Sequence, residues 1–185
     1  MTERALARID LGAVERNCDR LPKPLCAVVK AEAYGHGVGP VVEAALAGGA
    51  TWLAVATAAE AAELRRLAVD VPVLVMGAVT PDELQIAIDA GADLVAWSEE
   101  VAAAAPRVHV KLDTGMGRLG TRDRELALRL AAGPNTVGLM THFATADELD
   151  DDLFPAQLED FGRFVDEVGR DDLLVHAANS AAALR

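Results

Sequence analysis

Short apolar runs alternate with longer stretches rich in alanine, leucine, glutamate and arginine along most of the chain. The short runs are typical of buried strands, and the longer stretches have the composition of helices. Strands are predicted at 25–29, 52–55, 73–76, 93–97, 107–112, 136–142 and 173–176. Helices are predicted at 38–48, 57–68, 80–90, 98–104, 121–132 and 155–168. Because strands and helices alternate, the strands are expected to be parallel and joined by right-handed crossovers.

Capping residues support several of these helices. Thr80 is followed by Pro81 at the first helical position and by acidic residues in the first turn, as at many helix starts. The pair Gly48-Gly49 and the single Gly91 each follow a predicted helix. A left-handed residue is expected there, because helices commonly end on a glycine in that conformation.

The segment 107–112 separates two architectures, a doubly wound open sheet and a (β/α)8 TIM-type barrel. Residues 108–113 alternate between an apolar set, Val108, Val110 and Leu112, and a polar set, His109, Lys111 and Asp113. Outer helices need the apolar side, so the polar side faces inward. A barrel has room for that row, whereas an open sheet covered by helices on both faces has none. The sequence therefore favours the barrel.

All four histidines agree with a barrel, because each lies on a predicted strand or just past its end: His36, His109, His142 and His176. The carboxyl ends of such strands are where ligands bind. Seven strands are found, and about nine residues follow the last one. Since complete barrels usually span about 200 residues or more, we expect 1–185 to be an incomplete barrel of seven βα units that lacks the eighth.

Composition narrows the possible partners. The chain has 185 residues, of which 52% are hydrophobic and 25% charged, a balance typical of one globular domain. A net charge of −12 repels phosphate backbones and anionic lipid, so neither nucleic acid nor membrane is predicted as a partner. The two cysteines, Cys18 and Cys26, fit no metal or disulfide framework. A cytoplasmic location without a metal site is therefore predicted.

Lysine is scarce in this chain, which has 14 arginines but only Lys23, Lys30 and Lys111. Lys30 ends the first predicted strand, where an amine can form a Schiff base with a carbonyl compound. The structural alternative is a lysine that extends to solvent. The following glycine-rich segment 35–40 could cradle a phosphate, but a plain turn is favoured because the third glycine of a dinucleotide fingerprint is missing.

A second cluster of polar residues runs from Lys111 to Gly120. Its glycines allow close approach to a ligand, and Arg118 could bind an anionic oxygen. An internal salt bridge between Lys111 and Asp113 is the structural alternative. His142 follows the sixth strand, and Asn179 and Ser180 follow the seventh. Each of these three residues could line a ligand pocket. Each could equally be a polar residue at a strand end whose hydrogen bonds are made within the protein.

Together these segments resemble the bacterial alanine racemases, which are fold-type-III pyridoxal-phosphate enzymes. The segments are AVVKAEAYGHG at 27–37, VHVKLDTGMGRLG at 108–120, THFATADE at 141–148, HAANSAA at 176–182 and IDLGAVERN at 9–17. Glu32 departs from the family pattern, in which Asp or Asn is more usual at this position. The resemblance covers essentially the whole chain and identifies it with the N-terminal barrel domain, without the family's C-terminal β-domain.

The resemblance implies a role for each candidate residue. Lys30 binds the pyridoxal phosphate covalently and is one of two bases. Tyr34 binds the phosphate, Asn179 and Ser180 belong to the cofactor site, and His142 lines the ring of the cofactor. Arg118 contacts the phenolic oxygen of the cofactor and the substrate carboxylate, and Lys111 is a candidate for carbamylation. The implied reaction interconverts L-alanine and D-alanine by two-base proton transfer at Cα and supplies D-alanine for peptidoglycan. A homodimer is implied, since the second base is a tyrosine from the partner subunit's β-domain.

Other interpretations remain open on the sequence alone. The only tyrosine of the chain is Tyr34, so the second base is not found in 1–185. The resemblance also implies an arginine at the pyridine nitrogen, which in the family comes from beyond the seventh strand and is likewise not found in 1–185. Another fold-type-III enzyme is one alternative, such as a serine or broad-specificity racemase or an amino-acid decarboxylase. A non-catalytic pyridoxal-phosphate-binding barrel is a second, and a truncated product without activity is a third.

Overall fold

A curved sheet of seven parallel strands organises the computed structural model, which describes residues 5–185. The strands are β1 (Leu25–Val28), β2 (Ala50–Val55), β3 (Val73–Val75), β4 (Asp93–Ala96), β5 (Val108–Lys111), β6 (Thr136–Met140) and β7 (Leu174–His176). Their order in the sheet is their order along the chain, and every neighbouring pair is parallel. A doubly wound sheet would reverse its order at one point, so this alternative is wrong.

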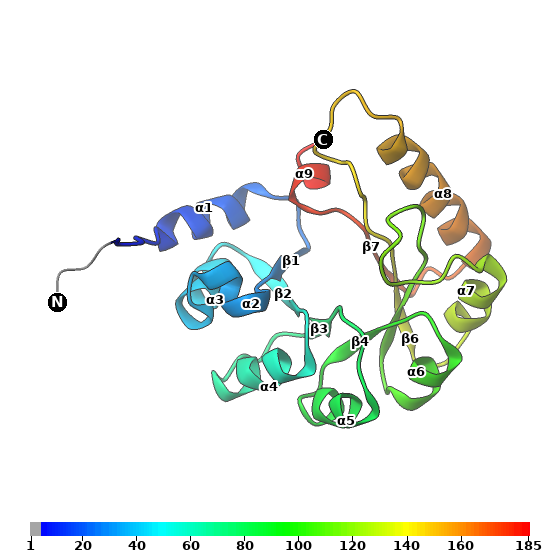
Figure 1. Cartoon of the computed structure of the whole chain (residues 1–185), viewed down its shortest axis with the longest axis horizontal. Helices are drawn as coiled ribbons and strands as arrows, with labels where there is room; N and C mark the ends of the chain where they lie inside the picture. Colours follow the sequence, from blue (N-terminus) through cyan, green and yellow to red (C-terminus); the bar gives the residue numbers. More distant parts are fainter. Residues whose placement is uncertain (1–4) are drawn as a thin grey trace.

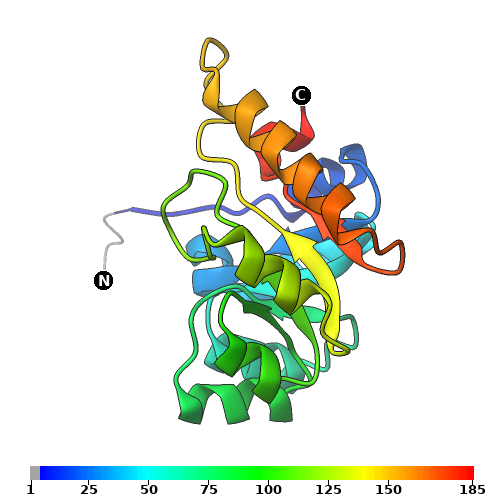
Figure 2. The same ribbon diagram turned by 90° about the vertical axis from the view of Figure 1, so that its right-hand side faces the viewer.

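Helices alternate with the strands along the chain, and most of them lie on the outside of the sheet (Figure 1). They are α1 (Leu11–Arg20), α2 (Lys30–Gly35), α3 (Val38–Ala47), α4 (Ala58–Arg66), α5 (Pro81–Asp89), α6 (Glu99–Ala104), α7 (Arg124–Ala131), α8 (Leu153–Val168) and α9 (Ser180–Ala183). Figure 2 shows α7 and α8 side by side on the outer face, where Arg124 forms ion pairs with Asp160 and Glu167. The predicted seven-unit (β/α)8-type barrel is confirmed. No helix among residues 5–185 is long and apolar enough to span a bilayer.

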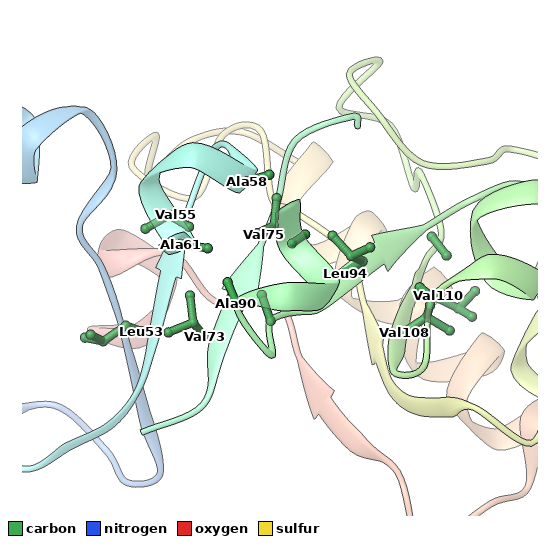
Figure 3. Packing of buried hydrophobic residues seen from close by; sticks show 14 of the residues in the cluster. Leu53, Val55, Ala58, Ala61, Val73, Val75, Ala90, Leu94, Val108 and Val110 are labelled. Atoms are coloured by element: carbon green, nitrogen blue, oxygen red, sulfur yellow. The ribbon is translucent and has the colours of Figure 1, made fainter. Parts of the chain in front are cut away.

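Alternate strand residues build two separate apolar layers. One set, which includes Leu53, Val73 and Val110, packs against the helices in the main core (Figure 3). The other set points inward, where Leu74 and Met140 belong to a smaller cluster with partly buried Cys26. The inward face is therefore only partly apolar, and it leaves room for polar side chains from the same strands.

Most predicted boundaries agree with the structure to within about two residues. Thr80 forms a capping box with Glu83, and Gly91 is left-handed with φ of 59°. In the glycine pair, only Gly49 is left-handed, whereas Gly48 has φ of −75°. The left-handed prediction is therefore wrong for Gly48. It needs glycine for another reason, because a Cβ there would lie 2.4 Å from the Glu15 carbonyl oxygen of α1.

A buried polar network lies on the inner face of the sheet, on the amino-terminal side of the carboxyl ends of the strands. Asp93, at the start of β4, pairs with Arg107 at 2.7 Å and with His109 Nε2 at 3.2 Å. His109 Nδ1 lies 2.8 Å from Nε2 of His176 on β7. Burial alone would raise the pKa of Asp93, but the hydrogen bonds from His109 and Arg107 outweigh it and lower that pKa. Burial, together with the nearby His109, lowers the pKa of His176 to about 3.

Gly138 on β6 makes room for this network. It is the register partner of His109, and a Cβ at Gly138 would lie 2.2 Å from His109 Nδ1. Real side chains do not approach that closely, so any larger residue would push the imidazole away from His176. The glycine is needed here for space, because the ring of His109 must cross over β6 to reach β7.

We expect Gly138→Ala to destabilise the protein by roughly 1–3 kcal/mol, since overpacking a buried site forces side chains out of their rotamers. The loss is measured as a lower midpoint of urea unfolding. Gly162→Ala on α8 is the matched control, because nothing lies within 4 Å of a Cβ there and alanine favours a helix. An unchanged midpoint for Gly138→Ala would contradict the close approach of His109.

The outer edges of β1 and β7 have no strand partner among residues 5–185. Each edge also presents an apolar side chain, with Val28 38% exposed and Val175 46% exposed. Unpaired parallel edges are templates for association. We therefore expect a polypeptide of residues 1–185 alone to self-associate, measured by light scattering. Val175→Lys should reduce the association, because a charged residue disfavours edge pairing, and a monodisperse monomer of the unsubstituted polypeptide would contradict the expectation.

Candidate functional site

The carboxyl ends of β1, β5, β6 and β7 carry the predicted site residues. Lys30 begins α2 two residues after β1, and Lys111 is the last residue of β5. His142 follows β6 by two residues, and Asn179 lies just beyond β7 as the cap of α9. In parallel α/β folds ligands bind at this end of the strands. The structure therefore brings these residues to one end of the barrel.

Lys30 is followed by a turn of unusual backbone. Four consecutive residues, Ala31 to Tyr34, have φ between 51° and 59° and ψ between 35° and 56°. Such left-handed conformations cost about 1–2 kcal/mol per residue for residues other than glycine. The turn brings Tyr34 back toward the lysine, so that Nζ of Lys30 lies 5.9 Å from the centre of the phenol ring. Tyr34 is 57% exposed, so its hydroxyl is available to a ligand.

Lys111 is almost completely buried, with 5% of its surface exposed. Its Nζ donates to the Arg118 carbonyl oxygen at 3.3 Å. Burial and then the charge of Arg118 lower the pKa of Lys111, and the charge of Asp113 only partly opposes them. A larger fraction of this amine is consequently neutral at a given pH than for an exposed lysine.

The alternative of a salt bridge between Lys111 and Asp113 is not formed. Asp113 instead accepts hydrogen bonds from the backbone N–H groups of Gly115 and Gly117, and it pairs with Arg122 at 3.0 Å. Its carboxylate therefore shapes the loop that follows β5. This loop presents Arg118 on the surface, close to the buried amine.

The pKa of His142 is affected by nearby positive charges. Burial lowers its pKa, and the positive charges of Lys111, Arg118 and Lys30 lower it further. Positive charges from the strand end of β5, the loop after it and the turn after β1 therefore all act on one imidazole. This concentration of positive charge stands out in a chain with a net charge of −12, and it suits an anionic ligand.

Gln157 holds two of the ligand-facing loops together, and sequence reasoning missed it. It lies on α8, is 1% exposed, and donates to Thr114 Oγ1 at 3.2 Å and to the His142 carbonyl oxygen at 3.1 Å. Its own oxygen accepts from the Ala144 N–H at 2.9 Å. A polar residue at a core position of a predicted helix was the one available signal, since buried amides are almost always hydrogen-bonded.

The remaining predicted residues divide between this site and other places. Asn179 accepts from the Ala182 N–H at 2.9 Å and reaches the Phe143 carbonyl oxygen, so it links the ends of β7 and β6, and Ser180 beside it is exposed. His36 is occupied with the Ala33 carbonyl oxygen at 2.8 Å. His109 and His176 belong to the buried network described above. Of the four histidines, His142 is therefore the one that belongs to the candidate site.

Two of the hollows on the surface of residues 5–185 differ in where they lie relative to this site. The smaller, of about 310 Å³, lies beside the left-handed turn and is lined in part by Tyr34, His36 and Arg8. The larger, of about 590 Å³, is lined by Ile88, Pro106 and Pro134 among others. Because Pro106 and Pro134 precede β5 and β6, this larger hollow lies at the amino ends of the strands, away from the candidate site.

Comparison with known proteins gives a consistent result. The family model for the alanine racemase N-terminal domain matches residues 9–185. The alanine racemase of Geobacillus kaustophilus is 42% identical over 198 residues, which cover 96% of this chain and 52% of the relative. The crystal structure of alanine racemase from E. faecalis superposes with a TM-score of 0.83 at 36% identity, over 95% of this chain and 53% of that one.

A histidine racemase from Leuconostoc mesenteroides also shares the fold, with a TM-score of 0.79 at 27% identity over 94% of this chain and 50% of that one. The chain spans about half the length of the relatives it matches. Because the family match begins near the N-terminus and reaches the last residue, and the seven strands superpose on solved racemases, this chain belongs to the alanine racemase family through its N-terminal barrel domain.

Proposed function

We propose that the protein to which this barrel belongs interconverts L-alanine and D-alanine with pyridoxal 5'-phosphate as cofactor. The observation that carries the proposal is that Lys30, Lys111 and His142 all lie at the carboxyl ends of the strands, with the loop of Arg118 directly after Lys111. An amine and two further cations are the groups needed to bind an aldehyde and the anionic groups of a phosphorylated cofactor and an amino acid. Family membership supports the same assignment.

The residues of the site fit pyridoxal phosphate by their chemistry. Lys30 would bind the aldehyde carbon, and the exposed hydroxyl of Tyr34 would bind the phosphate together with Ser180 and Asn179. The imidazole of His142 would line the ring, and Arg118 would contact the phenolic oxygen and the substrate carboxylate. When bound, the cofactor withdraws electrons from the substrate and makes its Cα–H bond acidic.

Lys30 would serve as the base on one face of the substrate. A neutral amine at the strand tip can accept the Cα proton and return it, and such positioned groups contribute roughly 10²–10⁴-fold to the rate. Racemisation also needs a group on the opposite face. Following the family resemblance, we assign that role to a tyrosine of a C-terminal β-domain of the partner subunit in a homodimer. The sole tyrosine of 1–185, Tyr34, is assigned to the phosphate instead.

The buried amine of Lys111 could be modified to a carbamate that pairs with Arg118. The neutral amine can attack carbon dioxide, with loss of one proton from nitrogen, and form a carbamate with one negative charge. The carbamate would replace a repulsive contact with Arg118 by an ion pair. It would hold the guanidinium at the position where a substrate carboxylate binds.

In the cell, this reaction would supply D-alanine for peptidoglycan in the cytoplasm, with no nucleic acid or membrane as a partner. A second candidate is racemisation of another amino acid. The structural similarity to a histidine racemase supports it, because the same barrel serves a different substrate there. Measured turnover of serine or histidine in excess of alanine would favour this second candidate.

We expect borohydride reduction of the protein with bound pyridoxal phosphate to fix the cofactor to the peptide that contains Lys30. Reduction removes the visible absorption of the protonated cofactor linkage, and mass spectrometry locates the label. Lys23 and Lys111 are internal controls, since they are the only other lysines of 1–185. A label on either of them would refute the assignment of Lys30.

The same protein should convert L-alanine to D-alanine, whereas a polypeptide of residues 1–185 should do so far more slowly. The expected difference is about 10²–10⁴-fold, which is the contribution of one positioned acid–base group. Full turnover by residues 1–185 would show that the second base lies among the residues assigned here to structure.

We expect Lys111 to carry a carbamate when the protein is treated with bicarbonate. Because burial and Arg118 lower the pKa of Lys111, its reactive neutral form is retained to lower pH than for an exposed lysine. The carbamate should be lost on acidification, as protonation releases carbon dioxide. Labelled bicarbonate and carbon-13 spectra measure it, with Lys111→Arg as the control without signal. A plain ammonium paired with Asp113 would contradict the prediction.

A further inference from the structure

Glu60 connects two loops at the candidate site. It lies in the first turn of α4, after β2, and its Oε2 accepts from the N–H groups of Ala56 at 2.8 Å and Thr57 at 2.9 Å. Its Oε1 accepts from the N–H of Ala31 at 2.7 Å. Ala31 comes directly after Lys30 and is the first of the four left-handed residues. One carboxylate therefore bonds its own helix start and the strained turn after β1.

The neighbouring helix shows what the same motif does without the additional contact. In α5, Thr80 and Glu83 form a capping box, with Glu83 Oε2 accepting from the Thr80 N–H at 2.8 Å. In α4, Thr57 and Glu60 form the same box. Only Glu60 also reaches a residue of another loop, 29 positions away in the chain. Helix capping alone accounts for Glu83, but it leaves the third bond of Glu60 unexplained.

The left-handed turn has few other anchors at its beginning. Its later residues are held by the Ala33 N–H to the Val29 carbonyl oxygen and by the Gly37 N–H to the Glu32 carbonyl oxygen. At Ala31 the backbone first enters the left-handed region, and its N–H is directed at Glu60. A hydrogen bond to a charged acceptor is among the stronger ones in proteins, so this contact is placed where the strain begins.

The charge state of Glu60 agrees with this arrangement. Burial would raise the pKa of Glu60, but the hydrogen bonds from Ala31, Thr57 and Ala56 outweigh it and lower that pKa. The side chain is thus an anion at neutral pH and accepts all three bonds.

We propose that Glu60 is a positioning residue, which holds the left-handed turn at Ala31 and thereby sets Lys30 and Tyr34 in their places in the cofactor site. Without this contact, Ala31 relaxes toward ordinary backbone angles, and the geometry that brings the lysine amine within 5.9 Å of the phenol ring is lost. The role toward the cofactor rests on the function proposed above. The role toward the turn does not depend on it.

The test compares Glu60→Gln with Glu83→Gln in the full-length protein. In Glu60→Gln the single amide oxygen can keep the two bonds of the helix start, but the NH₂ group then faces the Ala31 N–H and cannot accept from it. We expect amide hydrogen exchange at Ala31 to become about tenfold faster or more, which is the effect of losing one bond to a charged group. Glu83→Gln makes the same change in the matched capping box of α5 and should leave Ala31 unchanged.

The second readout is the affinity for pyridoxal phosphate, followed by absorbance and by borohydride labelling of Lys30. Glu60→Gln should weaken binding about tenfold or more, whereas Glu83→Gln should not change it. Adding Ala31→Gly to Glu60→Gln should restore a large part of the affinity, because glycine adopts positive φ without steric cost. A residue that only caps α4 would show no such rescue. The double variant also removes strain, so it remains measurable if the single variant folds poorly.

Each outcome decides the proposal. Unchanged exchange at Ala31 in Glu60→Gln, or equal effects of Glu60→Gln and Glu83→Gln, would reduce Glu60 to a helix cap and overturn it. Faster exchange with unchanged cofactor affinity would overturn the positioning role. Exchange is measured without cofactor, so a protein in which Ala31 responds to Glu60 but pyridoxal phosphate does not bind would refute the proposed function and leave the contact with the turn intact.

Discussion

Each strand of the curved parallel sheet must bury one face against the outer helices, and the rest of the structure depends on this constraint. Side chains alternate along a strand, so burying Val108 and Val110 against the helices turns His109 and Lys111 inward. Because His109 and Lys111 are buried there, away from water, their polar groups need partners. The network of His109 and the burial of Lys111 are both consequences of packing on the opposite face.

The two groups of polar residues on the inner face of the sheet differ in how their charges are paired. Below the strand ends, Asp93 compensates Arg107 and bonds His109, so the network is satisfied by residues of the chain itself. At the carboxyl ends, Lys111 and Arg118 are near each other, and the adjacent carboxylate of Asp113 is engaged with its own loop and with Arg122. An excess of positive charge in a partly buried region is costly unless an anion binds. The imbalance itself therefore favours an anionic ligand at that end.

Backbone strain is concentrated in the same region. The four left-handed residues after Lys30 are held by contacts from elsewhere in the fold, among them Glu60 on α4. Gln157 on α8 ties the loops after β5 and β6 in a similar way. Both residues are polar side chains of outer helices that bond backbone groups of loops. The outer layer thus sets the geometry of the loops as well as covering the sheet.

The sequence by itself determined the order of strands and helices, the inward direction of His109 and Lys111, and the resemblance carried by the segments around Lys30 and Arg118. These features depend on alternation and on local motifs, which are properties of short stretches of chain. Only the tertiary structure decided that Asp113 pairs with Arg122, that His109 joins His176 across Gly138, and that Glu60 and Gln157 hold the loops. The contacts of His109 with His176, of Glu60 with Ala31 and of Gln157 with Thr114 join different βα units, so they depend on the curvature and register of the sheet. The pair of Asp113 and Arg122 depends on how the loop after β5 folds back on itself. No local pattern specifies either.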